Sequence, residues 1–285
     1  MTERLADIGN RITGIHQLGE VVNAMRGIAA ARAQQARSQL TAVDGYSTTI
    51  AAAIAEVIPL IPARAGGPHI PRPTARLALV LFCAEQGFAG AFSERVLDEA
   101  CGDLKTADLF VIGTRGQATL AARGITAGWT SALPSHSPGI PKLADTVTQA
   151  LYVHIAAGKI DRLDAIYGLW EPGQGPRIER KHLLPFDMTA FVAPANANPP
   201  LLYLQPEAVV QALTADYLFA QLCEAALHGF AAENQARMEA MAAARNQIER
   251  QLSALQATQR RVRQEEITAE IIELASGEAA SQAKR

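Results

Sequence analysis

The sequence predicts an α/β fold in which a central sheet domain is flanked by two long helices formed by the chain ends. All fifteen prolines lie between Pro59 and Pro206, so residues 1–58 and 207–285 contain none. Because a proline inside a helix costs about 3 kcal/mol, long proline-free ends are typical of long helices. Between these ends, continuous apolar runs alternate with amphipathic stretches, which is the pattern of strands and helices in a largely parallel sheet.

The N-terminal segment, residues 1–58, predicts one helix with a narrow apolar seam. Apolar residues recur there at spacings of three and four, which places them on one helix face. The predicted seam residues of this helix are Ile8, Ile12, Ile15 and Val22. At the usual rise per residue the helix would be roughly 80 Å long. Its stretch VVNAMRGIAAARAQQAR (21–37) carries mostly small side chains, so we expect a plain outer surface.

The central segment predicts a compact domain over 72–195 that follows a linker over 59–75. Four runs predict strands: RLALVLFC (76–83), DLFVIG (108–113), RLDAIYGLW (162–170) and RIERKHLLPF (177–186). Helical patterns lie near 92–102, 115–124 and 142–158. The first two runs are apolar without a break, as expected for strands that are buried on both faces. We therefore expect a Rossmann-like α/β domain with a largely parallel sheet.

The C-terminal segment, residues 207–277, predicts the second long helix. Its seam residues fall on one repeat of three and four: Ile248, Leu252, Leu255 and Val262. Gly277 follows the apolar repeat closely and predicts the helix stop, which leaves 278–285 as a tail. A helix of this length would extend roughly 100 Å. The sheet domain would have a radius of only about 14 Å, so both helices must project beyond it and pair as a long antiparallel coiled coil.

Composition excludes several classes of function. The chain is 49% hydrophobic and 19% charged, which is typical of a folded globular protein. A net charge of -2 gives no reason to expect a nucleic-acid partner. Cys83, Cys101 and Cys223 show no CxxC spacing, so we expect free thiols rather than disulfides or a zinc site. No run approaches the ~20 apolar residues that cross a bilayer, so no direct membrane insertion is expected.

Catalytic motifs are also absent from the sequence. It contains no GxxxxGK[ST] phosphate loop, no GxGxxG and no GxSxG. The six histidines lack HxxxH spacing, which gives no pattern for a metal site. IGTRG (112–116) is bracketed by glycines at a strand end, where ligands often bind, but alone it is a weak signal for a nucleotide. We therefore expect no catalytic residue, no metal and no cofactor.

Several segments match one family pattern in order and spacing. The C-terminal helix carries Arg237-Met238, Ala240-Met241, Arg263-Gln264, Ile267-Thr268, Glu270-Ile271 and Ser276-Gly277. The N-terminal helix carries Ala24-Met25 and Ile28-Ala29-Ala30, and the turns after the first two strands are AEQGFAG (84–90) and VIGTRG (111–116). Over essentially its whole length, the chain resembles the gamma subunit of F-type ATP synthases.

The resemblance implies a non-catalytic rotor, the central-stalk subunit that transmits torque between an ion-driven membrane ring and the catalytic beta subunits. The implied partners are the alpha and beta subunits of the head, the epsilon subunit and the membrane c-ring. The implied location is the cytoplasmic face of the bacterial inner membrane, as a peripheral membrane protein. Carried over by matching positions, the residues that face the beta subunits are Met25, Arg26, Arg263, Gln264, Thr268 and Glu270.

Some positions depart from the family pattern. Glu20 and Asn23 stand where lysines are usual, and Gly27 stands where a methionine is common. Glu265 and Glu266 replace small residues. These departures suggest a divergent branch, and they motivate the hypothesis of an alternative, sodium-type ATPase operon. Because ion choice lies in the membrane ring, proton and sodium coupling both stay open.

Other interpretations stay open on the sequence alone. Met25 could fill the seam, and Arg263 with Gln264 could belong to an ordinary solvated helix face. The α/β domain could be an enzyme that uses the helices as a dimerisation arm, and substrate binding by residues 72–195 would favour that alternative. The chain could also be a coiled-coil scaffold protein with an α/β domain, which a homodimer without affinity for alpha and beta subunits would favour.

Overall fold

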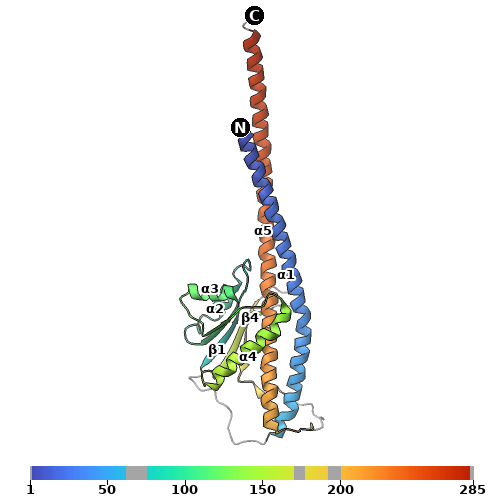
Figure 1. The fold of residues 1–285 in the computed structure, drawn as a ribbon, viewed down its shortest axis with the longest axis vertical. Coiled ribbons are helices and arrows are strands. Elements are labelled where there is room, and N and C mark those ends of the chain that lie inside the picture. The colour runs from blue at the N-terminus through green and yellow to red at the C-terminus, as the bar shows by residue number, and fades with distance from the viewer. Residues whose placement is uncertain (1, 62–75, 170–176, 192–199, 283–285) are drawn as a thin grey trace. The chain divides into compact units, whose positions relative to one another are not determined.

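Two long helices and a five-stranded sheet make up the fold. A computed structural model describes residues 2–61, 76–169, 177–191 and 200–282. Helix α1 spans Thr2–Val57 and helix α5 spans Pro206–Gln282 (Figure 1). The chain divides into two compact units. Unit 1 contains Met1–Ile28 with Met238–Arg285, and unit 2 contains Ala29–Arg237.

Helix α1 ends and helix α5 begins where the proline pattern predicts, but α5 ends later than expected. Pro206 is the first residue of α5, a position that tolerates proline because the N–H there has no helical partner. The predicted stop at Gly277 is wrong, since α5 continues to Gln282. One glycine costs a helix about 1 kcal/mol, which does not end it when Glu, Ala and Ala follow. Of the predicted tail, residues 283–285 lie outside the described ranges, as do residues 62–75 of the predicted linker.

The sheet lies in unit 2 and has the strand order β3-β2-β1-β4-β5. Its strands are β1 (Leu77–Phe82), β2 (Asp108–Ile112), β3 (Trp129–Ser131), β4 (Arg162–Leu169) and β5 (Arg177–Leu184). The first four are parallel, and only β5 is antiparallel to its neighbour. The largely parallel sheet is thereby confirmed, and of the five described strands only the short strand β3 was not predicted. Trp170, which ends the third predicted strand, and the stretch 171–176 lie outside the described residues.

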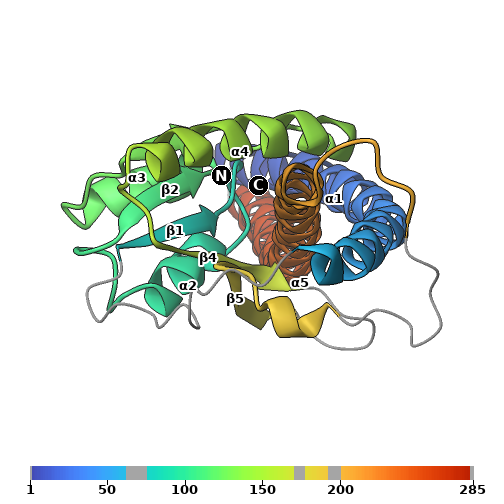
Figure 2. The same cartoon turned by 90° about the horizontal axis from the view of Figure 1, so that it is seen from below.

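Helices cover both faces of this sheet (Figure 2). One face, which carries Val80 and Phe110, packs against α4 (Ile140–Ala156) and against the parts of α1 and α5 that belong to unit 2. The other face, which carries Leu79 and Leu109, packs against α2 (Phe92–Glu99) and α3 (Thr114–Ala122). Alternate residues of each strand therefore enter two separate cores, as the unbroken apolar runs predict.

Unit 2 is larger than the predicted domain of residues 72–195. Ala36 and Leu40 of α1 are buried in the same core as Leu222 and Phe230 of α5. This packing makes residues 29–57 and 206–237 part of the sheet domain rather than of a separate helical rod. Short 3₁₀ turns complete the described elements: Ile58–Leu60, Ser137–Gly139 and Met188–Ala190.

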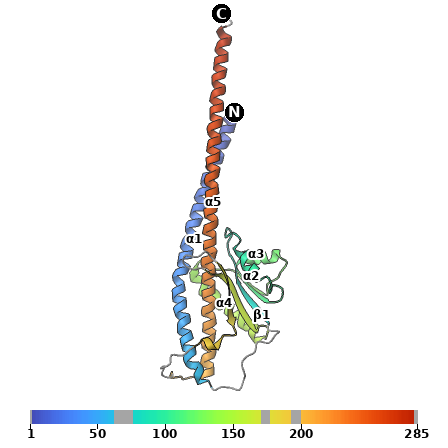
Figure 3. The same ribbon diagram turned by 180° about the vertical axis from the view of Figure 1, so that it is seen from behind.

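Unit 1 contains only the remaining parts of the two long helices, which run antiparallel (Figures 1 and 3). Beyond the N-terminal end of α1, α5 continues without a partner helix. A Cβ atom added to Gly19 of α1 would lie 3.5 Å from Ile248 Cγ2 of α5, so the two helices approach closely at this level. The predicted antiparallel pairing of the chain ends is present in this unit.

Candidate functional site

The seam of unit 1 is narrow and apolar. Val22, Met241 and Ile248 are buried together. Around them pack Ile15, Met25, Ala244 and Leu252. Of the other predicted seam residues, Ile8 and Val262 are buried and Ile12 and Leu255 are half-buried. The helix pair is thus held by one line of side chains, and the rest of its surface faces outward.

The residues predicted to face beta subunits fall into two groups. Met25 and Arg26 on α1 are half-buried, and Met25 packs in the seam cluster as the alternative interpretation expects. Arg263, Gln264, Thr268 and Glu270 on α5 are exposed. The Thr268 hydroxyl donates to the backbone carbonyl oxygen of Gln264 at 2.8 Å, a bond within one turn of the helix. Among the described residues of unit 1, no side-chain hydrogen bond or ion pair joins the two groups.

Unit 1 also exposes large apolar side chains outside the seam. On α1 these are Leu18, Val21 and Ile28, each more than half exposed. On α5 they are Ile267, Ile271, Ile272 and Leu274, with exposed fractions from 49% to 74%. Exposed apolar side chains that are grouped on a helix, rather than scattered singly, are typical of contact sites for other proteins. Helix-period spacing puts these residues along lines that a surrounding protein could cover.

The carboxyl edge of the parallel sheet, where ligands bind in many α/β proteins, is filled by the chain itself. Gly113, between β2 and α3, has φ +102 and passes so close to β1 that an added Cβ would lie 2.5 Å from the Cys83 carbonyl oxygen. The next residue, Thr114, donates its N–H to the Glu85 carboxylate at 3.0 Å, and Leu133 donates its N–H at 2.8 Å. The Glu85 carboxylate therefore occupies the N-terminus of α3, which is the position that a bound phosphate would need.

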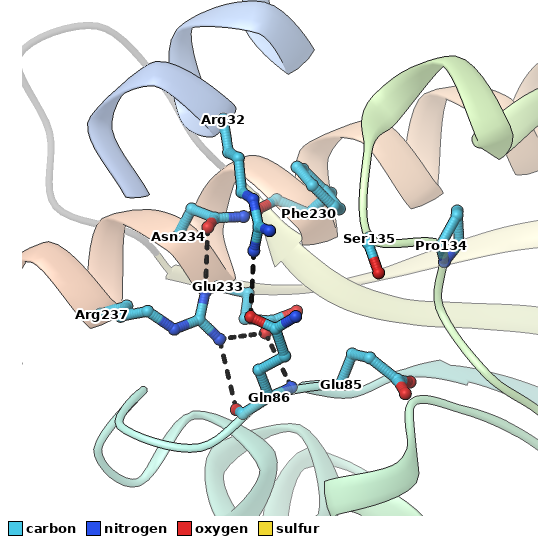
Figure 4. Close-up of a pocket in the computed structure, with 9 residues that line it drawn as sticks. All are labelled: Arg32, Glu85, Gln86, Pro134, Ser135, Phe230, Glu233, Asn234 and Arg237. Carbon is cyan, nitrogen blue, oxygen red and sulfur yellow. Dashed lines mark hydrogen bonds and ion pairs between the residues drawn. The ribbon is translucent and has the colours of Figure 1, made fainter. Parts of the chain in front are cut away.

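A second polar cluster lies in unit 2 beside Glu85 and ties the β1–α2 turn to both long helices (Figure 4). We name it the turn clamp, and it consists of Arg32, Gln86, Glu233, Asn234 and Arg237. Glu233 and Arg237 of α5 form an ion pair one helical turn apart and are 2% and 4% exposed. The small hollow beside them has a volume of about 10 Å³, which is room for about one water molecule.

The turn clamp satisfies backbone groups of the turn as well as its own charges. Arg237 donates to the carbonyl oxygens of Gly87 at 3.1 Å and Gln86 at 3.2 Å, and to the Asn234 side chain at 2.9 Å. The Gln86 N–H donates to the Glu233 carboxylate at 3.3 Å. From α1, Arg32 donates to the Gln86 side-chain oxygen at 2.9 Å. Burial raises the pKa of the Glu233 carboxyl, although Arg237 opposes this.

The clamped turn also holds an unusual backbone conformation. Phe88 has φ +64, which is uncommon for a bulky residue, and its side chain is 67% exposed. This cluster was not predicted as a site. Its signal was present, since Glu233 and Arg237 stand at ion-pair spacing in the stretch FAAENQAR (230–237), where both charges lie among alanines.

The described residues offer little to an enzyme interpretation. Within these ranges, no three or more His, Cys, Asp or Glu side chains come together as a metal site. A cleft of about 300 Å³ lies beside the end of β5. Its two basic side chains are already paired, Lys181 with Glu224 at 3.0 Å and His182 with Asp164 at 2.8 Å. Across the same ranges, no helix combines the length and apolar character that crossing a membrane requires.

The fold and the exposed seam helices define a class: a stalk protein, in which two terminal helices carry an α/β domain. Comparison with known proteins narrows this class. A family model described as ATP synthase matches residues 4–280. The ATP synthase gamma chain of Beutenbergia cavernae is 30% identical over 291 residues, covering 94% of both chains. The ATP synthase gamma chain of Flavobacterium johnsoniae is 25% identical over 281 residues, covering 96% of this chain and 97% of that one.

Solved structures share the fold at low sequence identity. A chain from the mitochondrial ATP synthase rotor of Euglena gracilis has a TM-score of 0.65 and 13% identity, covering 94% of this chain and 100% of its own length. A chain from the OSCP/F1/c-ring structure of the same enzyme has a TM-score of 0.68 and 12% identity, covering 99% and 96%. The protein belongs to the ATP synthase gamma chain family, as the sequence motifs predict.

Proposed function

We propose that this chain is the non-catalytic central-stalk subunit of a rotary ATP synthase, and that it carries torque between a membrane ring and the catalytic beta subunits. The single observation that carries the proposal is the surface of unit 1. Its two helices bury one narrow seam and leave Leu18, Val21 and Ile28 exposed on one helix and Ile267 to Leu274 on the other. Such a surface needs a protein around it.

The proposal extends to partners. Alpha and beta subunits would surround unit 1, with Arg263, Gln264, Thr268 and Glu270 turned toward the beta subunits and Met25 and Arg26 contributing from α1. The epsilon subunit and the c-ring would bind the sheet domain. Within residues 21–37, Val21 and Ile28 are the only large apolar side chains that are exposed. The mostly small surface of this stretch supports rotation within a sleeve, because deeply packed large side chains would each add ~1 kcal/mol or more to the barrier between positions.

The proposal also includes location and coupling. The chain would work at the cytoplasmic face of a bacterial inner membrane, held there by its partners. Coupling to protons or to sodium depends on the ring, so both remain part of the proposal. Active sites would lie on the beta subunits, and this chain would bind no cofactor of its own.

Co-expression with the alpha and beta subunits of the same organism tests the proposal. We expect one copy of this chain to co-elute with three copies of each partner, and ATP hydrolysis to require all of them. In vesicles that also carry the membrane ring, ATP should drive uptake of either protons or sodium, and each ion can be measured separately. A chain that elutes alone as a homodimer, with no assembly-dependent hydrolysis, would support the scaffold alternative instead.

A further inference from the structure

We propose that the turn clamp is the joint through which torque passes between the sheet domain and the two long helices, with Glu233 and Arg237 as its central positioning residues. This proposal rests on the proposed function as a rotor. It concerns contacts inside this chain, and it assigns a role to buried charges that neither seam packing nor partner binding uses.

The joint reaches the same turn from both helices. Arg32 of α1 holds the Gln86 side chain, while Glu233 of α5 accepts from the Gln86 N–H. Arg237 of α5 then binds the carbonyl oxygens of Gln86 and Gly87. Two residues of the sheet domain, Gln86 and Gly87, are therefore held by three charged side chains from two helices. Figure 4 shows the contacts to Gln86.

The position of the clamp in the chain suits a joint. Arg237 is the last residue of unit 2 on α5, and Arg32 lies close to Ala29, the first residue of unit 2 on α1. Any twist that leaves unit 2 along either helix must pass these residues. The clamp therefore lies where both helices continue out of the sheet domain.

The chemistry of the clamp also suits a joint. Apolar packing between sheet and helices holds them together, but the hydrophobic effect itself is non-directional. Charged hydrogen bonds have a fixed direction and are strongest when buried, so they resist a twist that would misalign them. Asn234, itself held by a bond to the Phe230 carbonyl oxygen at 2.8 Å, orients the Arg237 guanidinium.

The test uses the full assembly in ion-tight vesicles. The first variant combines Glu233→Gln with Arg237→Met, which removes both charges and so leaves no unpaired charge buried. We expect hydrolysis by the detached head to stay within about twofold of the unsubstituted protein. ATP-driven ion uptake against a gradient should fall on the order of tenfold, because the joint slips only under load.

A second variant keeps the test valid if the first fails to assemble. Arg32→Ala removes only the half-exposed arm from α1, and we expect a smaller loss of uptake against the gradient. Arg32→Lys keeps a charged donor for Gln86 and should restore uptake. The matched control is Glu249→Gln with Arg245→Met, which removes an exposed ion pair at the same spacing on the same helix, joined at 2.8 Å. The control should couple normally.

The outcomes separate the joint from the rotor proposal. If the unsubstituted chain supports no ATP-driven ion uptake, the rotor proposal is wrong. The joint proposal, which depends on it, is then wrong as well. If that chain pumps while the clamp variants pump equally well against the gradient, the joint is wrong and the rotor stands. If the variants lose hydrolysis and uptake in equal proportion, the clamp only stabilises the fold, and the joint is again overturned.

Discussion

Asp164 illustrates how single residues stabilise the sheet domain. It lies on β4, is 1% exposed, and accepts hydrogen bonds from Arg162 at 2.8 Å and Arg180 at 2.9 Å. His182 of β5 contacts its other oxygen at 2.8 Å. Arg180 continues to Asp103 at 2.7 Å, so the network links the hairpin to the segment after α2.

This network makes stability depend on pH. Burial alone would raise the pKa of the Asp164 carboxyl, but hydrogen bonds from His182, Arg162 and Arg180 hold the pKa below its ordinary value. Because the pKa of Asp164 is lower in the folded state, its ionised carboxylate stabilises the fold at every pH above the pKa that Asp164 has in the unfolded chain. That contribution is lost as the pH falls through the lowered folded value.

We predict that Asp164→Asn lowers the free energy of unfolding by about 2–3 kcal/mol at neutral pH, because Arg162 and Arg180 lose the negatively charged acceptor of their hydrogen bonds. The difference from the unsubstituted chain should begin to shrink below about pH 4, where Asp164 becomes protonated in the unfolded chain, and should continue to shrink as the pH falls through the lowered pKa of the folded state. Urea unfolding of the full chain at neutral and acidic pH measures the loss of stability and its dependence on pH. The control is Asp98→Asn, which removes an exposed pair with Arg123 joined at 2.8 Å and should cost about 0.5 kcal/mol or less. Equal losses at all pH values would contradict the prediction.

At the scale of elements, two neighbouring valines of α1 differ in their environment, because one lies in the seam and the other lies outside it. Val22 is 7% exposed and packs with Ile248, whereas Val21 is 55% exposed. Both lie within one helix, so replacement by alanine changes helix propensity equally. Any difference between the two variants then reports seam packing.

We predict that Val22→Ala destabilises the helix pair of unit 1 by about 1–2 kcal/mol more than Val21→Ala. Amide hydrogen exchange in residues 2–28 and 238–262, followed in the full chain without partners, measures this directly. Val22→Ala should speed exchange in both helices, and Val21→Ala should leave it unchanged or slower. Identical exchange in the two variants would show that the seam is misplaced.

The elements that the sequence predicted best are those with a long, simple signal. The proline distribution and the repeat of three and four lead to α1 and α5, and unbroken apolar runs lead to β1 and β2. β3 was missed because three residues at a sheet edge carry too little pattern. The turn clamp was missed for a different reason. The sequence shows that Glu233 can pair with Arg237, but only the packed chain shows that the turn after β1 meets them.

At the scale of the whole molecule, the predicted boundary between sheet domain and shaft needed correction. Sequence patterns separate a domain over 72–195 from its flanking helices, because composition changes there. Packing instead joins the adjoining parts of both helices to the sheet in unit 2, and only the parts up to Ile28 and from Met238 form unit 1. A sequence pattern predicts local secondary structure. The boundary between the two units depends instead on which surfaces are buried against one another in the folded chain.

The contact surface of the stalk gives the last prediction. Arg263 and Gln264 are exposed on α5, and the same dipeptide occurs again at Arg250 and Gln251, which are also exposed. Arg263→Ala with Gln264→Ala should leave the helix content unchanged, because alanine has the highest helix propensity. If these side chains contact beta subunits, assembly or ATP-driven ion uptake should fall on the order of tenfold.

The repeated dipeptide supplies the control for this experiment. Arg250→Ala with Gln251→Ala removes the same atoms from the same helix, where Arg250 bonds only within its own turn, to Gln247 at 2.7 Å. Gel filtration measures assembly, and ion uptake per ATP hydrolysed measures coupling. A loss confined to the first variant would support a contact at Arg263 and Gln264, because charge, helix propensity and side-chain entropy change equally in both. If both variants assemble and pump normally, the contact lies elsewhere on the stalk. The exposed apolar residues Ile267, Ile271 and Leu274 are then the surface to test, because burial of these side chains would have to provide the affinity.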